Sequence, residues 1–322
     1  MFKLIKNINL QLFATANTQT TGTASLSDEM KTYYSDYLID NAVPKLVHDQ
    51  FGQKHPIPKN GGKTIEFRKY SPLPKITTPL TEGVTPDGQS LTVTTLEATV
   101  EQYGGYVTIS DMLQLAAIDN NLVQATKLLG NQAGVSLDTI TREVLNGGTN
   151  VVYAGDATSR ETLSADDKLT VDTIKKAVRA LKKQNAEKIG DSFVAIIHPD
   201  ITYDLTNDPT WQSVKDYDPK DWYEGEIGRI AGVRFVETTE AKVFEGGVYS
   251  TLILGDNAYG VTEIEGGGLQ HFVKQLGSAG TNDPIDQRAT CGWKATKVAE
   301  RLVEQYMVRI ESKSTFTDTA AN

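Results

Sequence analysis

Three short stretches hold residue types that could do chemistry. Gly62-Lys63-Thr64 copies the end of a phosphate-binding loop, in which backbone amides and a lysine hold nucleotide phosphates. Such a loop needs a glycine five residues earlier, where this chain has Ile57, and a helix after it. The residues that follow, TIEFRKY, alternate like a strand. We therefore interpret the stretch as the turn that enters a strand.

The second stretch, Asp216-x-Asp218, resembles the start of a calcium-binding loop. Lys220 stands at the third ligand position, and Asp221 stands where such a loop needs glycine. We interpret residues 200–226 as a solvated acidic loop anchored by aromatic side chains.

The third stretch places His198 two residues before Asp200, which could support acid–base catalysis. A histidine that ends a strand before a proline is the more typical interpretation. The single cysteine, Cys291, lies beside Gly292 and Trp293, excludes an internal disulfide and is expected to be a small buried side chain. The four histidines are too scattered for a metal site (His48, His55, His198 and His271). We predict no catalytic, cofactor-binding or metal site, and no enzyme.

The composition narrows the class of protein further. The 322 residues carry a net charge of −9 and a pI near 5.1, which argues against a protein that mainly grips phosphate backbones. No run of 18 apolar residues predicts a membrane span. The start, MFKLIKNINLQLFATA, lacks the continuous apolar run of a signal peptide. We expect a soluble product of the cytoplasm.

The most regular pattern lies between Asp111 and Gly148. Apolar residues recur there at steps of three and four, as on one face of a helix (Leu115, Ile118, Leu122, Ala125, Leu129, Ala133, Leu137, Ile140 and Val144). About 35 helical residues would form a rod of roughly 50 Å, capped by Ser110 or Asp111 and ended by Gly147-Gly148. Gly130 and Gly134 weaken the helix and allow a bend or break there. Such a helix needs a sheet or another subunit along its length, although a core helix of an ordinary α/β domain would show the same pattern.

A long ribbon precedes this helix. Thr64–Tyr70 predicts a half-exposed strand, a proline-rich stretch follows, and residues 91–110 return as a second apolar run. Two arms of about 13–18 residues at about 3.3 Å per residue would span roughly 45–60 Å. Nothing in its own domain would cover such a ribbon, so a neighbouring subunit is the natural cover. A functional lid or a disordered insertion is the alternative.

The rest of the chain gives a coarser prediction. We expect an extended arm over residues 1–27 and a helix over 28–46 that Pro44 interrupts. We expect an amphipathic helix over 171–184, a buried strand over 193–197 and a short helix after it, then short strands. LQHFVKQ is typical of an edge strand, residues 288–312 predict a strand or helix pair, and the end is a polar tail.

Six stretches, in this order and spacing, resemble the major capsid proteins of tailed bacteriophages with the Hong Kong 97-like fold, in the branch of N4-type coat proteins. They are LIDNAVPKLVHDQFGQKHPIPKNGGKTIEFRKYSPLPK, TPLTEGVTPDG, QYGGYVTISDMLQL, FVAIIHPDITYDLTND, GEIGRIAGVRFVET and DPIDQRATCGWKAT. Each alone is a weak signal, and none is a chemical motif.

The resemblance implies an α+β fold with an N-terminal arm, an extended β-hairpin loop, a long spine helix, and peripheral and axial domains. Tyr70–Tyr106 would be the extended loop laid over an adjacent subunit, and Asp111–Gly147 the spine. The apolar start would clamp onto a neighbour. The implied parts are 1–55 (arm and helix), 56–109 (extended loop with flanking strands), 110–169 (spine and peripheral domain), 170–285 (axial domain) and 286–322 (return to the peripheral domain and tail).

The implied function is that of a capsid subunit that assembles into homo-pentamers and homo-hexamers, which form an icosahedral shell around double-stranded DNA. Implied partners are further copies of the chain, a scaffolding protein, a portal, a decoration protein and DNA bound without sequence specificity, with no membrane. The implied location is the virion, and the host cytoplasm during assembly. No matching crosslinking motif is present. Alternatives are a bacterial encapsulin-like nanocompartment shell, an enzyme with residues 190–285 as catalytic domain, and another virion part.

Overall fold

The computed structural model describes residues 18–19, 47–70, 73–116, 121–211, 228–278 and 283–322. These residues fall into two compact units. The first comprises the described parts of Met1–Asn41, Gly104–Ala133 and Leu269–Lys294. The second comprises those of Ala42–Tyr103, Gly134–Gly268 and Ala295–Asn322. The predicted arm (apart from 18–19), the predicted helix over 28–46 and most of the acidic loop lie outside the described residues.

The first unit is built on strand pairs. Strand β1 (Thr18–Gln19) runs parallel to β5 (Glu101–Ser110), and β13 (Gln270–Lys274) runs antiparallel to β14 (Arg288–Arg301), with Phe272 opposite Gly292. All five residues of β13 are exposed, as expected of an edge strand. Cys291 is fully buried, which confirms its prediction, and its sulfur lies 3.1 Å from His271 Nε2 and 3.2 Å from Thr126 Oγ1.

Two helices, α1 (Asp111–Ala116) and α2 (Asn121–Asn146), occupy the stretch predicted as one rod. Residues 117–120 lie outside the described residues, so a single continuous rod stays a prediction. Helix α2 continues through Gly130 and Gly134, where we expected weakness. The caps are confirmed, because Ser110 Oγ accepts the Leu113 amide at 3.3 Å and Gly147 follows the last turn.

The predicted apolar stripe of this stretch is partly right. Leu129 and Ala133 are buried, but Leu115 is 80% exposed. The buried face of the C-terminal part of α2 is largely polar instead, with Asp138, Thr141, Arg142 and Asn146 all buried.

The second unit contains a seven-stranded sheet in the order β6-β15-β11-β7-β9-β8, with β10 beside β11. The strands are β6 (Val151–Tyr153), β7 (Phe193–Ile197), β8 (Arg229–Ile230), β9 (Val233–Glu237), β10 (Val243–Phe244), β11 (Val248–Leu254) and β15 (Met307–Ser312). Strands β7, β11 and β15 are wholly buried, and only β7 is a continuous apolar run.

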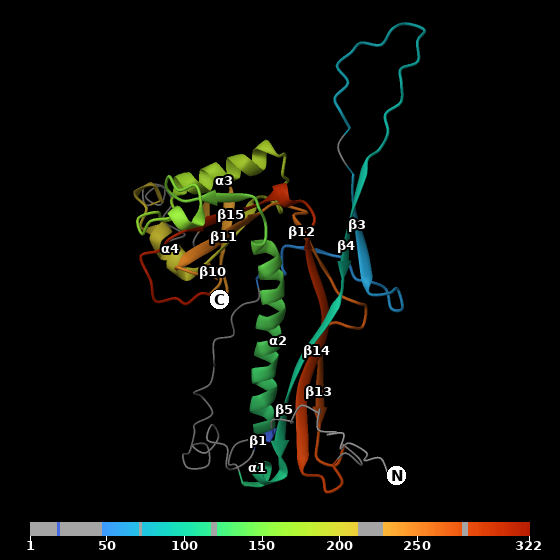
Figure 1. The fold of residues 1–322 in the computed structure, drawn as a ribbon, viewed down its shortest axis with the longest axis vertical. Coiled ribbons are helices and arrows are strands. Elements are labelled where there is room, and N and C mark those ends of the chain that lie inside the picture. Colours follow the sequence, from blue (N-terminus) through green and yellow to red (C-terminus); the bar gives the residue numbers. More distant parts are fainter. Residues whose placement is uncertain (1–17, 20–46, 71–72, 117–120, 212–227, 279–282) are drawn as a thin grey trace, which may run out of the picture. The chain divides into compact units, whose positions relative to one another are not determined.

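The two helices predicted before and after the buried strand are present, and both contribute to the core of this sheet (Figure 1). Helix α3 (Val171–Lys183) buries the predicted apolar side, including Ile174 and Leu181, in the core that also holds Phe193 and Val308. Thr170 caps α3, since its hydroxyl accepts the Thr173 amide. The short helix α4 (Pro199–Thr206) follows β7, and the short 3₁₀ helices η1 (Arg160–Thr162) and η3 (Glu304–Tyr306) lie in connections.

The polar tail that we predicted at the end of the chain is attached by hydrogen bonds. Its residues dock on α4 in the second unit: Ser314 Oγ and the Thr315 amide both donate to Asp204 at 2.8 Å. Thr319 Oγ1 donates to Asp200 at 2.7 Å, and the Phe316 ring meets the Tyr203 ring edge-on. Strand β15, which we assigned to the peripheral domain, pairs with β11 and β6. The predicted domain boundaries stay predictions.

The remaining strands of the second unit lead to the hairpin. Strand β12 (Tyr259–Thr262) lies between the last residues of β14 and β2 (Gln53–Lys54). Strands β3 (Thr64–Tyr70) and β4 (Val93–Thr99) form a separate two-stranded sheet, whose register runs from Thr64 opposite Thr99 to Tyr70 opposite Val93.

Candidate assembly interface

The residues that could have done chemistry take structural positions. Lys63 and Thr64 enter β3 after Gly62, which has a φ of +90°, and the Lys63 carbonyl accepts the Val100 amide at 2.7 Å. This confirms a strand-entry turn. The pair Asp216 and Asp218 lies outside the described residues.

His198 is the N-cap of α4 and accepts the Asp200 amide on Nδ1 at 3.2 Å. Burial lowers the pKa of His198, against the nearby acidic groups that raise it. Burial would raise the pKa of Asp200, but hydrogen bonds from Tyr249 and Thr319 outweigh it and leave that pKa below its ordinary value. Burial and the same Asp200 contact raise the pKa of Tyr249 to about 12. These groups tie α4, β11 and the chain end together.

The described residues contain no group of three or more acidic, histidine or cysteine side chains placed to hold a metal ion. Within those same ranges, no helix is long and apolar enough to cross a membrane. The absence of a catalytic, cofactor or metal site stays a prediction.

The candidate interface is the loop that closes the β3–β4 hairpin. Only seven residue pairs form the ladder, so the paired arms are shorter than the 13–18 residues we expected. Residues 73–92 beyond it contain no helix or strand, and every one of them is exposed. Figure 1 shows this loop continuing past the ends of β3 and β4. Prolines at 74, 79 and 86 remove amide donors and keep the loop out of a longer ladder.

This loop exposes an unusual amount of apolar surface. Ile76 and Leu80 are each 74% exposed, and Val84 is 62% exposed. Leu73, Leu91 and Val93 add to the same surface. A concentration of exposed large apolar side chains in one segment is typical of an interaction site. The loop is rich in apolar residues, and no described part of the chain covers it.

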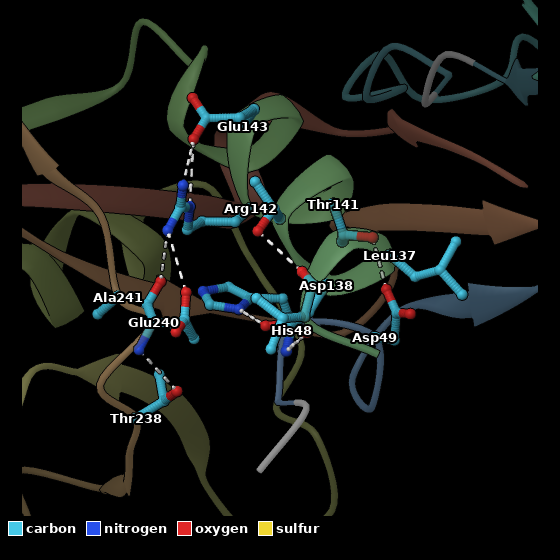
Figure 2. A network of polar contacts seen from close by, with 12 residues as sticks. His48, Asp49, Leu137, Asp138, Thr141, Arg142, Glu143, Thr238, Glu240 and Ala241 are labelled. Carbon is cyan, nitrogen blue, oxygen red and sulfur yellow. Dashed lines mark hydrogen bonds and ion pairs between the residues drawn. The ribbon is translucent and has the colours of Figure 1, made fainter. Parts of the chain in front are cut away.

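The C-terminal part of α2, by contrast, is held by polar contacts inside the second unit (Figure 2). His48 donates its amide to Asp138 at 2.8 Å, and its Nδ1 lies 2.7 Å from the other carboxylate oxygen. Both side chains are about 1% exposed. Tyr259 donates its hydroxyl to the His48 carbonyl, and burial raises the pKa of Tyr259 well above its usual range.

Asp49 makes the second attachment. It accepts the Thr141 hydroxyl at 2.5 Å and pairs with Lys297 of β14. The Lys297 ammonium also donates to the Leu137 carbonyl at 2.7 Å. One buried cation thus joins the chain before β3, the helix and β14.

The third attachment is made by Arg142. Its guanidinium donates to Glu143 at 2.8 Å and to the Glu240 carbonyl at 3.0 Å, as Figure 2 shows. Lys242 reaches the same Glu143 carboxylate at 3.0 Å. The turn before β10 is thereby fixed to the helix.

A fourth group holds the last turn of α2 to the sheet. Ser250 Oγ donates to Asn146 at 2.5 Å, and Arg309 donates to the Asn146 carbonyl. The fully buried Glu311 lies between Arg309, at 2.9 Å, and Arg160, at 2.6 Å. The hydrogen bond to Glu311 raises the pKa of Arg160. Charges buried this deeply stay paired because an unpaired one would be costly.

Our sequence reasoning missed this network. A signal was present, because Asp138, Thr141, Arg142 and Asn146 recur at helical spacing on one face. The partners His48, Asp49 and Lys297 come from distant parts of the sequence, and no local pattern points to them.

Comparisons with known proteins agree with this architecture. A family model described as a phage capsid protein matches residues 93–298. No curated protein matches the chain. The capsid of cyanophage P-SCSP1u is similar over 88% of this chain and 93% of that chain, with 12% identity and a TM-score of 0.68. The capsid of Ralstonia phage GP4 is similar over 90% and 96%, with 15% identity and a TM-score of 0.67.

A third similar structure is the holo-SrpI encapsulin complex of Synechococcus elongatus PCC 7942. It covers 92% of this chain and 98% of that chain, with 9% identity and a TM-score of 0.58. At such identities these likenesses show a shared fold. They confirm the predicted fold class, an α+β fold consistent with the Hong Kong 97-like type. The N4-type branch stays a prediction.

Proposed function

We propose that this chain, which belongs to the phage capsid protein family, interlocks with its own copies through the 73–92 loop. The capsid function itself follows from the family. The observation that carries the proposal is the loop: twenty exposed residues with several apolar side chains, on a chain whose seven-stranded sheet buries β7, β11 and β15. A neighbouring copy would cover this surface.

The finer assignments rest on the same proposal. Copies would form pentamers and hexamers, ring-like contacts that close by rotation. Residues 170–285 would act as the axial domain around the ring centre, with β15 completing its sheet. A scaffolding protein, a portal, a decoration protein and packaged DNA would be partners, during assembly in the host cytoplasm and in the virion. The net charge of −9 favours holding DNA without gripping it. No enzymatic activity is part of this role.

A replacement of the loop tests the proposal. Tyr70 and Val93 are the last pair of the hairpin ladder. Replacing residues 71–92 with Asn-Gly supplies a two-residue turn that closes this pair. We expect the protein to keep its far-ultraviolet circular dichroism and thermal midpoint but to form no shells under electron microscopy. Normal shells from this variant would overturn the proposal.

The encapsulin likeness favours one second candidate, a shell around a protein cargo. Purified particles distinguish the two. Capsids from infected or lysogenic cells would contain double-stranded DNA, whereas a nanocompartment would contain a folded cargo protein and no genome.

A further inference from the structure

A groove of about 570 Å³ lies at the root of the hairpin, within the second unit. Its apolar lining comes from β3, β4 and two further segments (Pro56, Ile65, Phe67, Leu96, Leu302 and Val303). Its volume lies within the range of clefts that bury a small ligand or an anchoring side chain.

The groove is preformed. The Phe67 ring lies so close to Gly260 that a Cβ added there would sit 3.2 Å from it, and Leu302 lies 3.4 Å from the same point. The His55 ring meets Phe67 edge-on, at 5.9 Å between centroids. Gly260, Leu302 and His55 therefore hold the Phe67 ring, one of the lining side chains, in place.

The loop of the same hairpin ends in a matching shape. The Val84 amide donates to the Thr81 carbonyl at 3.1 Å, and Gly83 has a φ of +76°, which defines a tight turn. Leu80 and Val84 flank this turn, and both are mostly exposed. The turn therefore presents two aliphatic side chains on a narrow tip.

The loop carries a net negative charge, and the groove contains one cation that is partly exposed. The loop carries Glu82 and Asp87 against the single base Lys75. The groove is lined by His55 and Arg68, with Glu66 as the acidic counterpart. The Arg68 side chain is 63% exposed and lies 3.3 Å from Glu66, so it remains open to a second carboxylate. Glu82, inside the turn, is placed to supply one.

We infer that the groove binds the Thr81–Val84 turn of a second copy of this chain, an inference that rests on the proposed function and names the site that receives the loop. The loop leaves the hairpin beyond Tyr70 and Val93 and stays exposed within its own chain. Each copy thus offers one tip and one groove on different surfaces. Such a heterologous contact repeats from copy to copy and closes a ring, in which every tip is seated and every groove is filled.

Engineered disulfides test this inference. The only native cysteine, Cys291, is fully buried, so it adds little background. We would combine Val84→Cys at the tip with Val303→Cys in the groove, and oxidise assembled shells. A disulfide needs the two Cα atoms within about 7 Å. The matched control pairs Val303→Cys with Ser90→Cys, which lies on the same loop but roughly 20 Å along the extended chain from Val84.

The expected result is a ladder of covalent oligomers on a non-reducing gel that ends at five and six copies, with no ladder from the control or from either single variant. Absence of the ladder, or a disulfide within one chain only, would overturn the inference. A ladder from the control pair as strong as that from the Val84 pair would also overturn it.

Should the double variant not assemble, the two single variants are co-assembled in excess wild-type protein. We expect covalent dimers only when both variants are present, and their absence would overturn the inference. Intact shells without the crosslink would overturn the groove as the binding site but would not contradict the proposed role of the loop in assembly. Shells from the Asn-Gly replacement would remove that role instead, so the two failures are distinguishable.

Discussion

The C-terminal part of α2 and the 73–92 loop differ in whether their side chains find partners within one copy of the chain. The helix turns a polar face inward and satisfies it with His48, Asp49 and Lys297 from its own unit. The loop leaves Ile76, Leu80 and other apolar side chains exposed to solvent. The first region is complete in one copy, whereas the second is completed only by another copy. Stability and assembly should therefore respond to different substitutions.

Substitutions at the loop tip should give the largest difference between the effect on assembly and the effect on folding stability. Replacing both Leu80 and Val84 with serine removes two side chains whose burial contributes about 1.5–3 kcal/mol each. We expect the protein concentration needed for shell formation to rise about 100-fold or more. The free energy of unfolding should change by less than about 0.5 kcal/mol. Light scattering and urea unfolding measure the two quantities, with Thr77→Ser and Thr78→Ser as the matched control. A large loss of folding stability would break the comparison.

The opposite behaviour is expected at Asp138. Asp138→Ala leaves the buried His48 amide and imidazole without their acceptor, so the free energy of unfolding should fall by about 3 kcal/mol. Asp172→Ala is the control, because Asp172 is exposed in the first turn of α3 and makes an i,i+4 pair with Lys176 at 3.0 Å. That control should cost about 0.3–0.5 kcal/mol. Similar losses in both variants, measured by urea unfolding, would mean that the network does not hold the helix.

A smaller effect should follow from the shape of the turn. Gly83 has a φ of +76°, a conformation that costs other residues roughly 1–2 kcal/mol. Gly88 lies on the same loop without a positive φ, and a Cβ at either position would meet nothing within 4 Å. Gly83→Ala should therefore raise the assembly concentration about 5–30-fold, whereas Gly88→Ala should not raise it. Equal shifts in the two variants would contradict a role for the turn.

The smallest expected effect is a pH dependence of folding. Burial lowers the pKa of His198 below that of the unfolded chain, so the unfolded state takes up this proton first. The contribution of His198 to the free energy of unfolding is present above the ordinary histidine pKa and declines as the pH falls below about 6.5. The groups facing His198 are Asp200, Tyr249, Glu237 and Glu240. His198→Asn should flatten the profile of unfolding free energy between pH 7 and about 5, and an unchanged slope would exclude His198 as its source.

The sequence predicted correctly those elements that depend on neighbouring residues, such as amphipathic helices, apolar strands and helix caps. The period of Val171–Leu181 gave α3 with its buried side, and the apolar run Phe193–Ile197 gave a buried strand. The caps at Ser110 and Gly147 followed from residue type. The sequence also predicted the extended hairpin loop, because prolines this dense disfavour both a helix and a central strand.

Other features depended on partners far along the chain. The polar face at Asp138 made sense only once His48 was beside it, 90 residues away. The docking of Ser314 and Thr315 on Asp204 likewise depends on tertiary contacts. The groove at Phe67 requires the close approach of Gly260, which no local pattern contains.

Hydrogen exchange of the loop amides tests the central claim most directly. Residues 73–92 should exchange at nearly the rate of an unstructured peptide in the unassembled protein and become strongly protected in shells, while amides of β7 stay protected in both. Equally fast exchange of the loop in both states would show that no neighbour covers it, and would contradict the account.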